Sequence, residues 1–349
     1  MCKKVIVFTQ THNNEKTLHR CIDSIINQTY GEFVYYIADN ASTDSTKEII
    51  SQYAEQDKRI IPVYCNDNLI WQIYTCLPEI LAKYDINDCL IVLDSDDEYI
   101  PDAFEKLLRF MAEGDLEVAA CTTDYIDGDD GSDLNRQVLE NNLIISGLNF
   151  EAQFPEYFKF VRDSWGKMFS LSLFSHLEFQ SFNHTIQHGS TSILSFEALC
   201  NSKRFGVLAQ RLHKYYIYTH SLEQSGSTRI SAPMLYKYYR DWVISKCGQL
   251  NDLNKRFLYG AYFRAIKNRT LPLIHSNIGL KEKLGLLRMV FDDILTTEMM
   301  SCDQIDGVSS ENKAEYIGIV LSWVDSICFE EETEESLLCA YIRHRLEQM

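Results

Sequence analysis

Two kinds of hydrophobic pattern alternate over the first 125 residues, and this alternation limits what the chain can fold into. Between short apolar runs, other apolar residues recur at helical spacing, as at Leu18, Ile22 and Ile25. The runs themselves are rich in β-branched residues, as buried strands are, and they span residues 5–9, 33–38, 60–64, 90–93 and 118–122. Strand and helix signals in alternation predict an α/β fold with a mostly parallel sheet flanked by helices.

Polar clusters follow three of these apolar runs. The first run leads into "TQTHNNE" (residues 9–15), the second into "DNASTDST" (39–46) and the fourth into "DSDDE" (94–98). In a parallel sheet the carboxyl ends of the strands lie at one edge, and ligands bind there. The sequence therefore predicts that the three clusters converge on one site.

The third cluster concentrates acidic residues at the end of an apolar run. Like charges this close raise one another's pKa, so the cluster is destabilising unless a cation lies there. In extended backbone Asp94 and Asp96 point the same way and Ser95 the opposite way, which leaves Asp97 to cap the next helix. Such a pair suits Mg²⁺ or Mn²⁺ shared with a substrate diphosphate. The alternative is a helix N-terminus that carries acids because the helix dipole favours them.

Motif residues occur in a fixed order through this region. They are Ser24 and Gln28 at the end of the first helical pattern, then Asp39, Asn40, Ser42, Thr43, Asp44 and Thr46, then Asp94 and Asp96. Their order and spacing resemble the signature of glycosyltransferase family 2, which has the GT-A fold and includes bacterial capsule and cell-surface polysaccharide enzymes. The resemblance is close over about residues 3–112 and weaker up to about residue 225.

This resemblance implies a donor site at the edge of the sheet. Asp39 would hydrogen-bond the base, usually uracil, and Asp94 would lie near the ribose and diphosphate. Asp96, with His220, would hold Mn²⁺ or Mg²⁺, which stabilises negative charge on the departing nucleoside diphosphate. The full set of residues expected at the nucleotide-sugar is Thr11, Asn13, Glu15, Asp39, Asn40, Asp94 and Ser95.

The acceptor side is expected to include Asp163, Trp165 and Lys167, with an indole platform beside a cation. A plain core role for Trp165 is the alternative. Relatives that invert the anomeric carbon by direct displacement need a general base to take the acceptor proton.

The expected base is missing from its usual place. Relatives carry an aspartate where this chain has Thr191, and a threonine hydroxyl is no base near neutral pH. His188 and Glu197 are the candidate replacements, and Asp163 is a further option. Each has a plainer interpretation, because a histidine in a loop or a glutamate on a helix is often only a solvated side chain.

Bulk composition excludes several kinds of partner. A formal net charge of −17 argues against nucleic acid and against broad binding to anionic membranes. The eleven cysteines include no Cys-x-x-Cys pair, and the apolar run near the N-terminus is too short for a secretory signal. These features predict reduced thiols in a cytoplasmic protein. No stretch reaches the roughly 18 apolar residues that a transmembrane helix needs.

The chain divides into an expected GT-A nucleotide-sugar-binding and acceptor domain (1–228) and a helical region of unknown role (229–349). Within the second part, residues 255–288 contain eight Lys or Arg and one acid, Glu282. One hypothesis is peripheral contact with lipid headgroups or with a polyanionic acceptor. The alternative is a helical face whose cations pair with acids such as those at 330–335. An apolar helical tail is also compatible with a homo-oligomer.

Two functions follow from these observations. The first is an inverting, metal-dependent glycosyltransferase that moves a hexosyl or N-acetylhexosaminyl group from a UDP-sugar to a glycan or lipid-linked acceptor. The second is a pseudo-glycosyltransferase that binds the nucleotide-sugar or assists assembly, as the loss of the aspartate at Thr191 suggests. A nucleotidyltransferase is disfavoured because "TQTHNNEKT" has no glycine to wrap a triphosphate.

Overall fold

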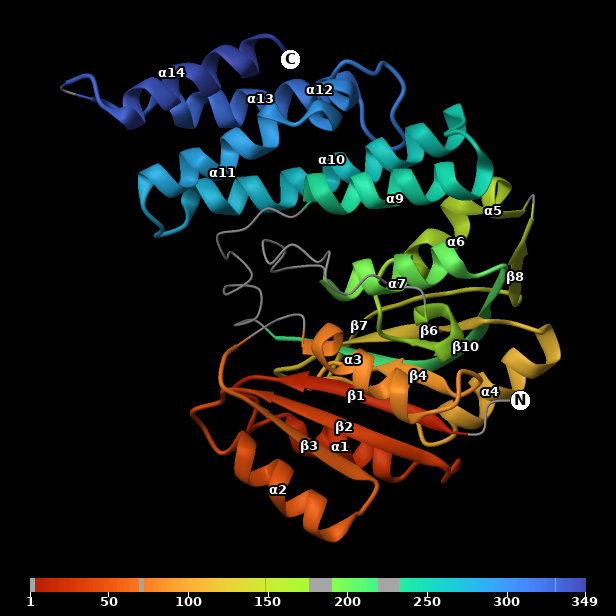
Figure 1. Ribbon diagram of the computed structural model, residues 1–349. Helices are drawn as coiled ribbons and strands as arrows, with labels where there is room; N and C mark the ends of the chain where they lie inside the picture. Colours follow the sequence, from red (N-terminus) through yellow and green to blue (C-terminus); the bar gives the residue numbers. More distant parts are fainter. Residues whose placement is uncertain (1–3, 69–71, 148, 176–189, 219–231, 330) are drawn as a thin grey trace. The chain divides into compact units, whose positions relative to one another are not determined.

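The structure is a computed structural model that describes residues 4–68, 72–147, 149–175, 190–218, 232–329 and 331–349 (Figure 1). The chain forms two compact units, residues 1–219 and 220–349. The boundary expected between residues 228 and 229 falls within 219–231, outside the described residues.

The first unit follows the predicted alternation of strands and helices. Its elements are β1 (Val5–Thr11), α1 (Leu18–Ile26), β2 (Phe33–Asn40), α2 (Thr46–Gln56), β3 (Ile60–Cys65), α3 (Gln72–Lys83), β4 (Cys89–Val92), β5 (Glu98–Tyr99), α4 (Ala103–Gly114), β6 (Val118–Asp127), β7 (Asp133–Arg136), β8 (Leu143–Ser146), α5 (Asn149–Ala152), α6 (Phe154–Val161), β9 (Lys167–Ser170), a 3₁₀ turn (Leu171–Phe174), α7 (Ser190–Asn201) and β10 (Arg204–Ile217).

One sheet runs through this unit in the order β3-β2-β1-β4-β9-β6-β10-β5, with β7 beside β6 and β8 beside β10. Strands β3, β2, β1 and β4 are parallel, and so are β6 and β10, which confirms the predicted sheet. Strand β9 runs antiparallel between β4 and β6. Thr11 at the end of β1 pairs in register with Asp39 near the end of β2, so the first two polar clusters begin side by side.

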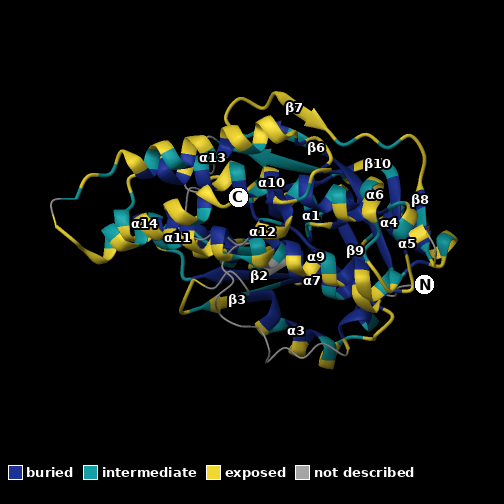
Figure 2. Ribbon diagram, turned by 90° about the horizontal axis from the view of Figure 1, so that it is seen from above, coloured by how far each residue is buried: buried dark blue, intermediate teal, exposed yellow. Residues whose placement is uncertain are grey.

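Helices cover both faces of the sheet, which explains why its strands read as continuous apolar runs. Val5 and Val7 belong to a core that α1, α2 and α4 close, whereas Ile6 and Phe8 are buried on the opposite face. Helix α3 contacts β1, and α6 contacts β6. Figure 2 shows the central strands buried and β7 exposed along its length.

One local prediction needs correction. The spacing Ser45-x-x-Glu48 predicts a capping box at the start of α2, which does begin after Ser45; the Ser45 side chain makes no capping hydrogen bond, so the box is not formed. The polar sequence of residues 126–148 predicts a loop or an irregular hairpin. The hairpin is confirmed, since β6 and β7 pair antiparallel with a register shift between Tyr125 and Ile126, and β8 follows.

The second unit is helical throughout its regular structure, as predicted. Its elements are α9 (Ala232–Cys247), α10 (Asp252–His275), α11 (Leu280–Asp292), α12 (Ile294–Met300), α13 (Ser310–Asp325) and α14 (Glu334–Glu347). Capping boxes begin α13 at Ser309 and α14 at Thr333. Across the described part of the chain, no helix is long and apolar enough to cross a membrane.

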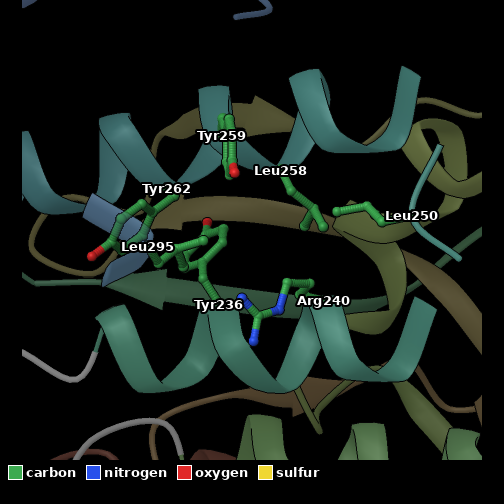
Figure 3. A pocket seen from close by; sticks show the side chains of 7 residues that line it. All are labelled: Tyr236, Arg240, Leu250, Leu258, Tyr259, Tyr262 and Leu295. Carbon is green, nitrogen blue, oxygen red and sulfur yellow. The ribbon is translucent and has the colours of Figure 1, made fainter. Parts of the chain in front are cut away.

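A small void lies between helices of this unit (Figure 3). The space open to the centre of a water-sized sphere is only about 10 Å³, which is at the lower limit for one water molecule. The void is therefore a packing defect and too small for an organic ligand. It is lined by Tyr236, Arg240, Leu250, Leu258, Tyr259, Tyr262 and Leu295.

Four of the eight cations in the basic stretch 255–288 form ion pairs with acids of their own unit. The shortest pairs are Lys281–Glu334 at 2.7 Å and Arg288–Asp292 at 3.1 Å. Lys267 lies 3.6 Å from Glu315, and Arg256 lies 3.8 Å from Asp306. This pattern agrees with the predicted pairing of cations and acids and gives no support to membrane contact through this stretch.

The cysteines depart from expectation at one described position. Nine are free thiols, as predicted. Cys89 on β4 is disulfide-bonded, so the prediction that all thiols are reduced fails there.

Candidate functional site

The turns after β1 and β2 are bound to each other by side-chain hydrogen bonds. The Asn13 N–H donates to Ser42 Oγ at 2.9 Å, and the Thr43 N–H donates to Asn13 Oδ1 at 2.8 Å. Asn13 and Ala41 take left-handed φ angles of 55° and 56°, which turn the two segments toward each other. Asn13 therefore shapes the edge, and its side-chain oxygen is already occupied by Thr43.

A second set of bonds extends this contact to the start of α2. The Asn14 N–H donates to Thr46 Oγ1 at 2.9 Å, and the Glu15 N–H donates to Asp44 Oδ2 at 3.1 Å. The Ser45 N–H donates to Glu15 Oε2 at 3.0 Å. A carboxylate from the neighbouring turn thus takes the amide at the N-terminus of α2, where a negative charge is favoured.

Two polar side chains are buried at the strand ends themselves. Thr11 and Asp39 are each only 3% exposed. Asp39 Oδ1 accepts the Ser42 N–H at 3.3 Å, whereas Thr11 Oγ1 has no hydrogen-bond partner within the described residues. The neighbouring Asn40 is buried, and its carbonyl accepts from His12 Nδ1 at 2.7 Å. A buried acceptor and an unpaired hydroxyl at one edge suit a polar ligand.

The acidic segment after β4 forms a turn at Ser95 and Asp96, not the extended backbone predicted for it. Asp94 and Asp96 are half-buried, whereas Ser95 is buried and its hydroxyl accepts from the Asn14 amide. Burial, then the charges of Asp96 and Asp163, raise the pKa of Asp94 to about 7. Burial also raises the pKa of Asp96, although the Asp96 backbone amide and Arg20 oppose this shift. Carboxylates that repel at this edge favour a cation between them and a ligand.

Asp97 does not have the predicted capping role. Helix α4 begins at Ala103, after Asp102. The Asp97 side chain is fully buried; Oδ1 accepts the Tyr216 N–H at 2.9 Å, and Oδ2 lies 3.4 Å from His213 Nε2. Burial, then Asp96 and Asp94, raise its pKa well above the ordinary range.

Ser24 and Gln28, known from the sequence only as motif residues, hold the segment that follows the acidic turn. Ser24 Oγ accepts the Tyr99 N–H at 3.3 Å. Gln28 Nε2 donates to the Ile100 carbonyl at 2.7 Å, and its Oε1 accepts the Phe104 N–H at 3.1 Å. Helix α1 therefore fixes the backbone downstream of Asp94 and Asp96.

Sequence reasoning missed Arg20 of α1. Its guanidinium lies over the Tyr216 ring, 3.4 Å from the centroid, and donates to the Asp96 carbonyl and, at 2.9 Å, to Tyr218 Oη. Its only sequence signal is its place one helical turn before Ser24. Arg20 therefore supports the acidic turn through the backbone and leaves the Asp96 carboxylate available.

The expected acceptor residues lie close together but do not all face outward. Trp165 is half-buried and stacks on His213 with centroids 5.1 Å apart and planes at 14°. Lys167 is 1% exposed, and its Nζ donates to the carbonyls of Asp163 and Trp165. Burial lowers the pKa of Lys167 to about 8. The predicted acceptor contact of Lys167 is therefore wrong: it supports the Trp165 backbone from inside.

Among the base candidates, Asp163 and Glu197 have described side chains. An Asp163 carboxylate oxygen lies 3.0 Å from Arg162 Nε, and Asp163 accepts a hydrogen bond from Ser192 Oγ at 3.5 Å. The negative charge of Asp163 also raises the pKa of Asp94. Glu197 is half-buried on α7, where burial raises its pKa to about 7 although a hydrogen bond from Tyr74 opposes this. His188 and His220 lie outside the described residues.

The fit of a divalent cation can be judged from the donor set. Within the ranges the structure describes, no three His, Cys, Asp or Glu side chains form a closed metal site. Asp94 and Asp96 are hard oxygen donors that leave most coordination positions to phosphate and water, as Mg²⁺ and Mn²⁺ accept. The residues present therefore fit such a cation when it is shared with a diphosphate.

Comparisons with known proteins agree with this arrangement. The chain is 28% identical over 185 residues to glycosyltransferase GlyA of Streptococcus pneumoniae. The aligned region is 50% of this chain and 26% of GlyA. It is 32% identical over 111 residues to the putative teichuronic acid biosynthesis glycosyltransferase TuaG of Bacillus subtilis, covering 31% and 42%. The chain thus spans less than half the length of these two relatives.

A solved structure shares the fold over nearly the whole chain. TarS 1–349 of S. aureus in complex with UDP superposes with a TM-score of 0.61 at 14% identity, covering 99% of this chain and 88% of that one. The fold of this chain is therefore GT-A with a helical C-terminal region. The model of the family described as "Glycosyl transferase family 2" matches residues 6–196, more than half of the chain. This chain belongs to glycosyl transferase family 2.

Proposed function

We propose that this protein is an inverting, metal-dependent glycosyltransferase that uses a UDP-sugar donor. The observation that carries the proposal is the convergence of Asp39, Asp94 and Asp96 on one sheet edge, on turns held together by side chains. The family membership supports transfer chemistry, and structures of TarS in complex with UDP and with UDP-GlcNAc support a uridine donor.

Each buried group at the edge has a place in donor binding. Asp39 Oδ accepts from the uracil N–H, and Thr11 Oγ1 supplies a further polar contact. Asp94 would lie toward the ribose and diphosphate, and Asp96 would hold Mn²⁺ or Mg²⁺. When bound, this cation stabilises the negative charge of the leaving diphosphate. Arg20 and Gln28 keep the acidic turn in place while the carboxylates bind.

The acceptor side supplies a base. We propose Asp163, because of the two described base candidates, Asp163 and Glu197, it is the one whose charge raises the pKa of Asp94, and its side chain is 24% exposed. Its Oδ takes the proton from the acceptor hydroxyl as that oxygen attacks the anomeric carbon. Trp165 lies two residues away and is half-buried, and its indole offers an apolar surface for an acceptor sugar. The acceptor is a glycan or a lipid-linked glycan.

Calorimetric titration tests the donor site. UDP, with GDP as the control nucleotide, is titrated into the protein with and without Mn²⁺, and the series is repeated on Asp96→Ala. Asp303→Ala, an exposed aspartate of the second unit, is the matched control. We expect Mn²⁺-dependent UDP binding in the wild type and in the control and its loss in Asp96→Ala. A UDP affinity that is the same with and without Mn²⁺, and the same in wild type and Asp96→Ala, would contradict the proposal.

A pseudo-glycosyltransferase is the second candidate because the family resemblance implies an aspartate where this chain has Thr191. The test is UDP release from a panel of UDP-sugars by a protein already shown to bind UDP. Binding without release, unchanged in Asp163→Asn, would favour the pseudo-enzyme. Release that depends on Asp163 would exclude it.

A further inference from the structure

A fully buried carboxylate–imidazole pair lies between the acidic turn and Trp165. Asp97 and His213 are both 0% exposed, and Asp97 Oδ2 lies 3.4 Å from His213 Nε2. His213 Nδ1 lies 3.4 Å from the hydroxyl of Thr123 on β6. Neither the donor site nor the proposed base uses this pair.

The His213 ring is packed between two aromatic rings. Its centroid lies 5.1 Å from that of Trp165, with the planes nearly parallel at 14°, and 5.1 Å from that of Tyr99 at 58°. Tyr99 directly follows the acidic segment and is anchored by Ser24. The imidazole therefore acts as a spacer between that segment and the indole.

The backbone at Trp165 is fixed independently of its ring. Lys167 Nζ donates to the Trp165 carbonyl at 3.0 Å. Gly166 has a left-handed φ of +66°, which side chains rarely adopt, and it lies next to Thr123 and His213. With the backbone held in this way, the orientation of the indole depends on the rings around it. His213 stacks on it nearly in parallel, Tyr215 lies 5.2 Å away at 30°, and Tyr125 meets it edge-on at 6.5 Å.

Strand β10 departs from regular pairing to place His213 there. Its pairing with β6 shifts register between Leu208 and Arg211 and again between Arg211 and His213. Leu212 and His213, at this second irregularity, are both fully buried. Irregularities of this kind near active sites re-aim a side chain.

Stability does not explain the pair. Replacing a buried polar pair with apolar residues of similar size is often neutral or stabilising. Here Asp97 Oδ2 and His213 Nε2 lack well-aligned hydrogen bonds, which adds to the cost of burying them. The pair does connect the acidic turn to the Trp165 ring, because Asp97 directly follows the proposed metal ligand Asp96 and His213 stacks on Trp165.

We infer that Asp97 and His213 are positioning residues that set the Trp165 indole against the acidic turn, so that an acceptor pyranose on the indole faces the donor. This inference rests on the proposed function for its ligands. The half-exposed indole is flat and apolar, which suits the C–H face of a pyranose ring. Asp97 and His213 themselves touch neither substrate.

Near-ultraviolet circular dichroism tests the positioning role without an activity assay. The wild-type spectrum minus that of Trp165→Phe isolates the signal of the Trp165 indole. We expect His213→Asn, which removes the stacking surface, to reduce this signal at least twofold. His213→Phe, which keeps a flat ring, should restore most of it. His19→Asn on the exposed face of α1 is the control and should leave it unchanged.

Calorimetry with UDP and Mn²⁺ separates this inference from the proposed function. We expect His213→Asn to bind UDP within about threefold of wild type, because the donor carboxylates stay in place. A wild-type protein that fails to bind UDP would defeat the proposed function, while the dichroism would still report the packing of Trp165. A full Trp165 signal in His213→Asn would overturn the positioning role.

Binding of a pyranose to the Trp165 indole is tested with methyl β-D-glucopyranoside and methyl N-acetyl-β-D-glucosaminide at millimolar concentration, with UDP and Mn²⁺ present. We expect at least one of them to change the Trp165 signal in wild type and in His213→Phe, and to change it several-fold less in His213→Asn. No change with either sugar, or an equal change in all three proteins, would overturn the proposal that a pyranose binds at Trp165.

Discussion

The carboxyl edge of the sheet and the helical second unit bury polar groups in opposite ways. At the edge, Asp94 and Asp97 lie buried or half-buried among other acids, with raised pKa values. In the helical unit, buried hydroxyls pair with each other: Tyr262 with Thr296 at 2.6 Å, and Tyr316 with Thr270 at 2.8 Å. The edge buries carboxylates beside one another, whereas these four hydroxyl-bearing residues of the helical unit pair with each other.

This difference indicates which substitutions alter function and which alter stability. Residues whose burial is costly and only partly compensated are candidates for binding and catalysis. Residues whose polar atoms are paired within the same unit contribute to the free energy of unfolding. Variants at the edge should therefore change binding or rate with little loss of stability, and variants in the helices should do the reverse.

Replacement of the proposed base should have the largest effect. We expect Asp163→Asn to lower the rate of UDP release about a thousandfold, because general-base catalysis contributes about 10²–10⁴-fold. The assay measures UDP released from the UDP-sugar that wild type consumes fastest. Glu197→Gln, which removes the other described carboxylate candidate, should change the rate less than threefold. The reverse ranking would assign the base to Glu197.

Loss of the proposed metal ligand comes next. We expect Asp96→Ala to weaken Mn²⁺-dependent UDP binding at least a hundredfold in calorimetry, about 2.7 kcal/mol. Its melting temperature should stay level or rise, because the Asp96 charge raises the pKa of Asp94 and its removal relieves repulsion. A large fall in melting temperature would mean that Asp96 is structural, which would remove the contrast between the two regions.

The pH dependence of stability should show the cost of burying Glu197. Its folded pKa of about 7 lies above the unfolded value of 4.5, so its contribution is most favourable below pH 4.5 and is lost as pH rises through 7. Denaturant melts at pH 5 and pH 8 measure this contribution. We expect the free energy of unfolding of wild type to fall by about 2 kcal/mol more than that of Glu197→Gln. Parallel profiles would show that the Glu197 carboxyl is well solvated.

A buried hydroxyl pair in the helical unit should show the opposite behaviour. Tyr316→Phe leaves Thr270 Oγ1 without its tyrosine partner, although Thr270 also donates to the Ile266 carbonyl. We expect a loss of about 1 kcal/mol in the free energy of unfolding and unchanged UDP affinity. Weaker UDP binding in this variant would show that the helical unit influences the donor site.

The smallest effect is expected at the exposed pair of Lys281 and Glu334. Both side chains are more than 60% exposed, and such pairs contribute little in water. Lys281→Ala should leave the melting temperature, UDP affinity and binding to anionic liposomes unchanged. If wild type binds anionic liposomes and Lys281→Ala does not, the result would support membrane contact through residues 255–288.

Local patterns were enough to predict β1, β2, β4 and the three polar turns, because apolar runs and turn residues act over short distances. The prediction for Ser95 and its flanking aspartates assumed extended backbone, whereas Ser95 and Asp96 lie in a turn. The roles of Asp97, Arg20 and Lys167 could not be predicted. Arg20 meets the Asp96 carbonyl across 76 residues of chain, and Asp97 meets Tyr216 across 119. Such partners are set by how β9 and β10 enter the sheet.

The interlocked turns after β1 and β2 should be visible in amide hydrogen exchange. The amides of Asn13, Thr43 and Ser45 lie at an exposed rim, yet each donates to a side chain of the opposite turn. Their protection should rise and fall together, since opening one turn removes the acceptors of the other. A nucleotide would then meet a rim that is already ordered, so little of its binding free energy would be spent on arranging the loops.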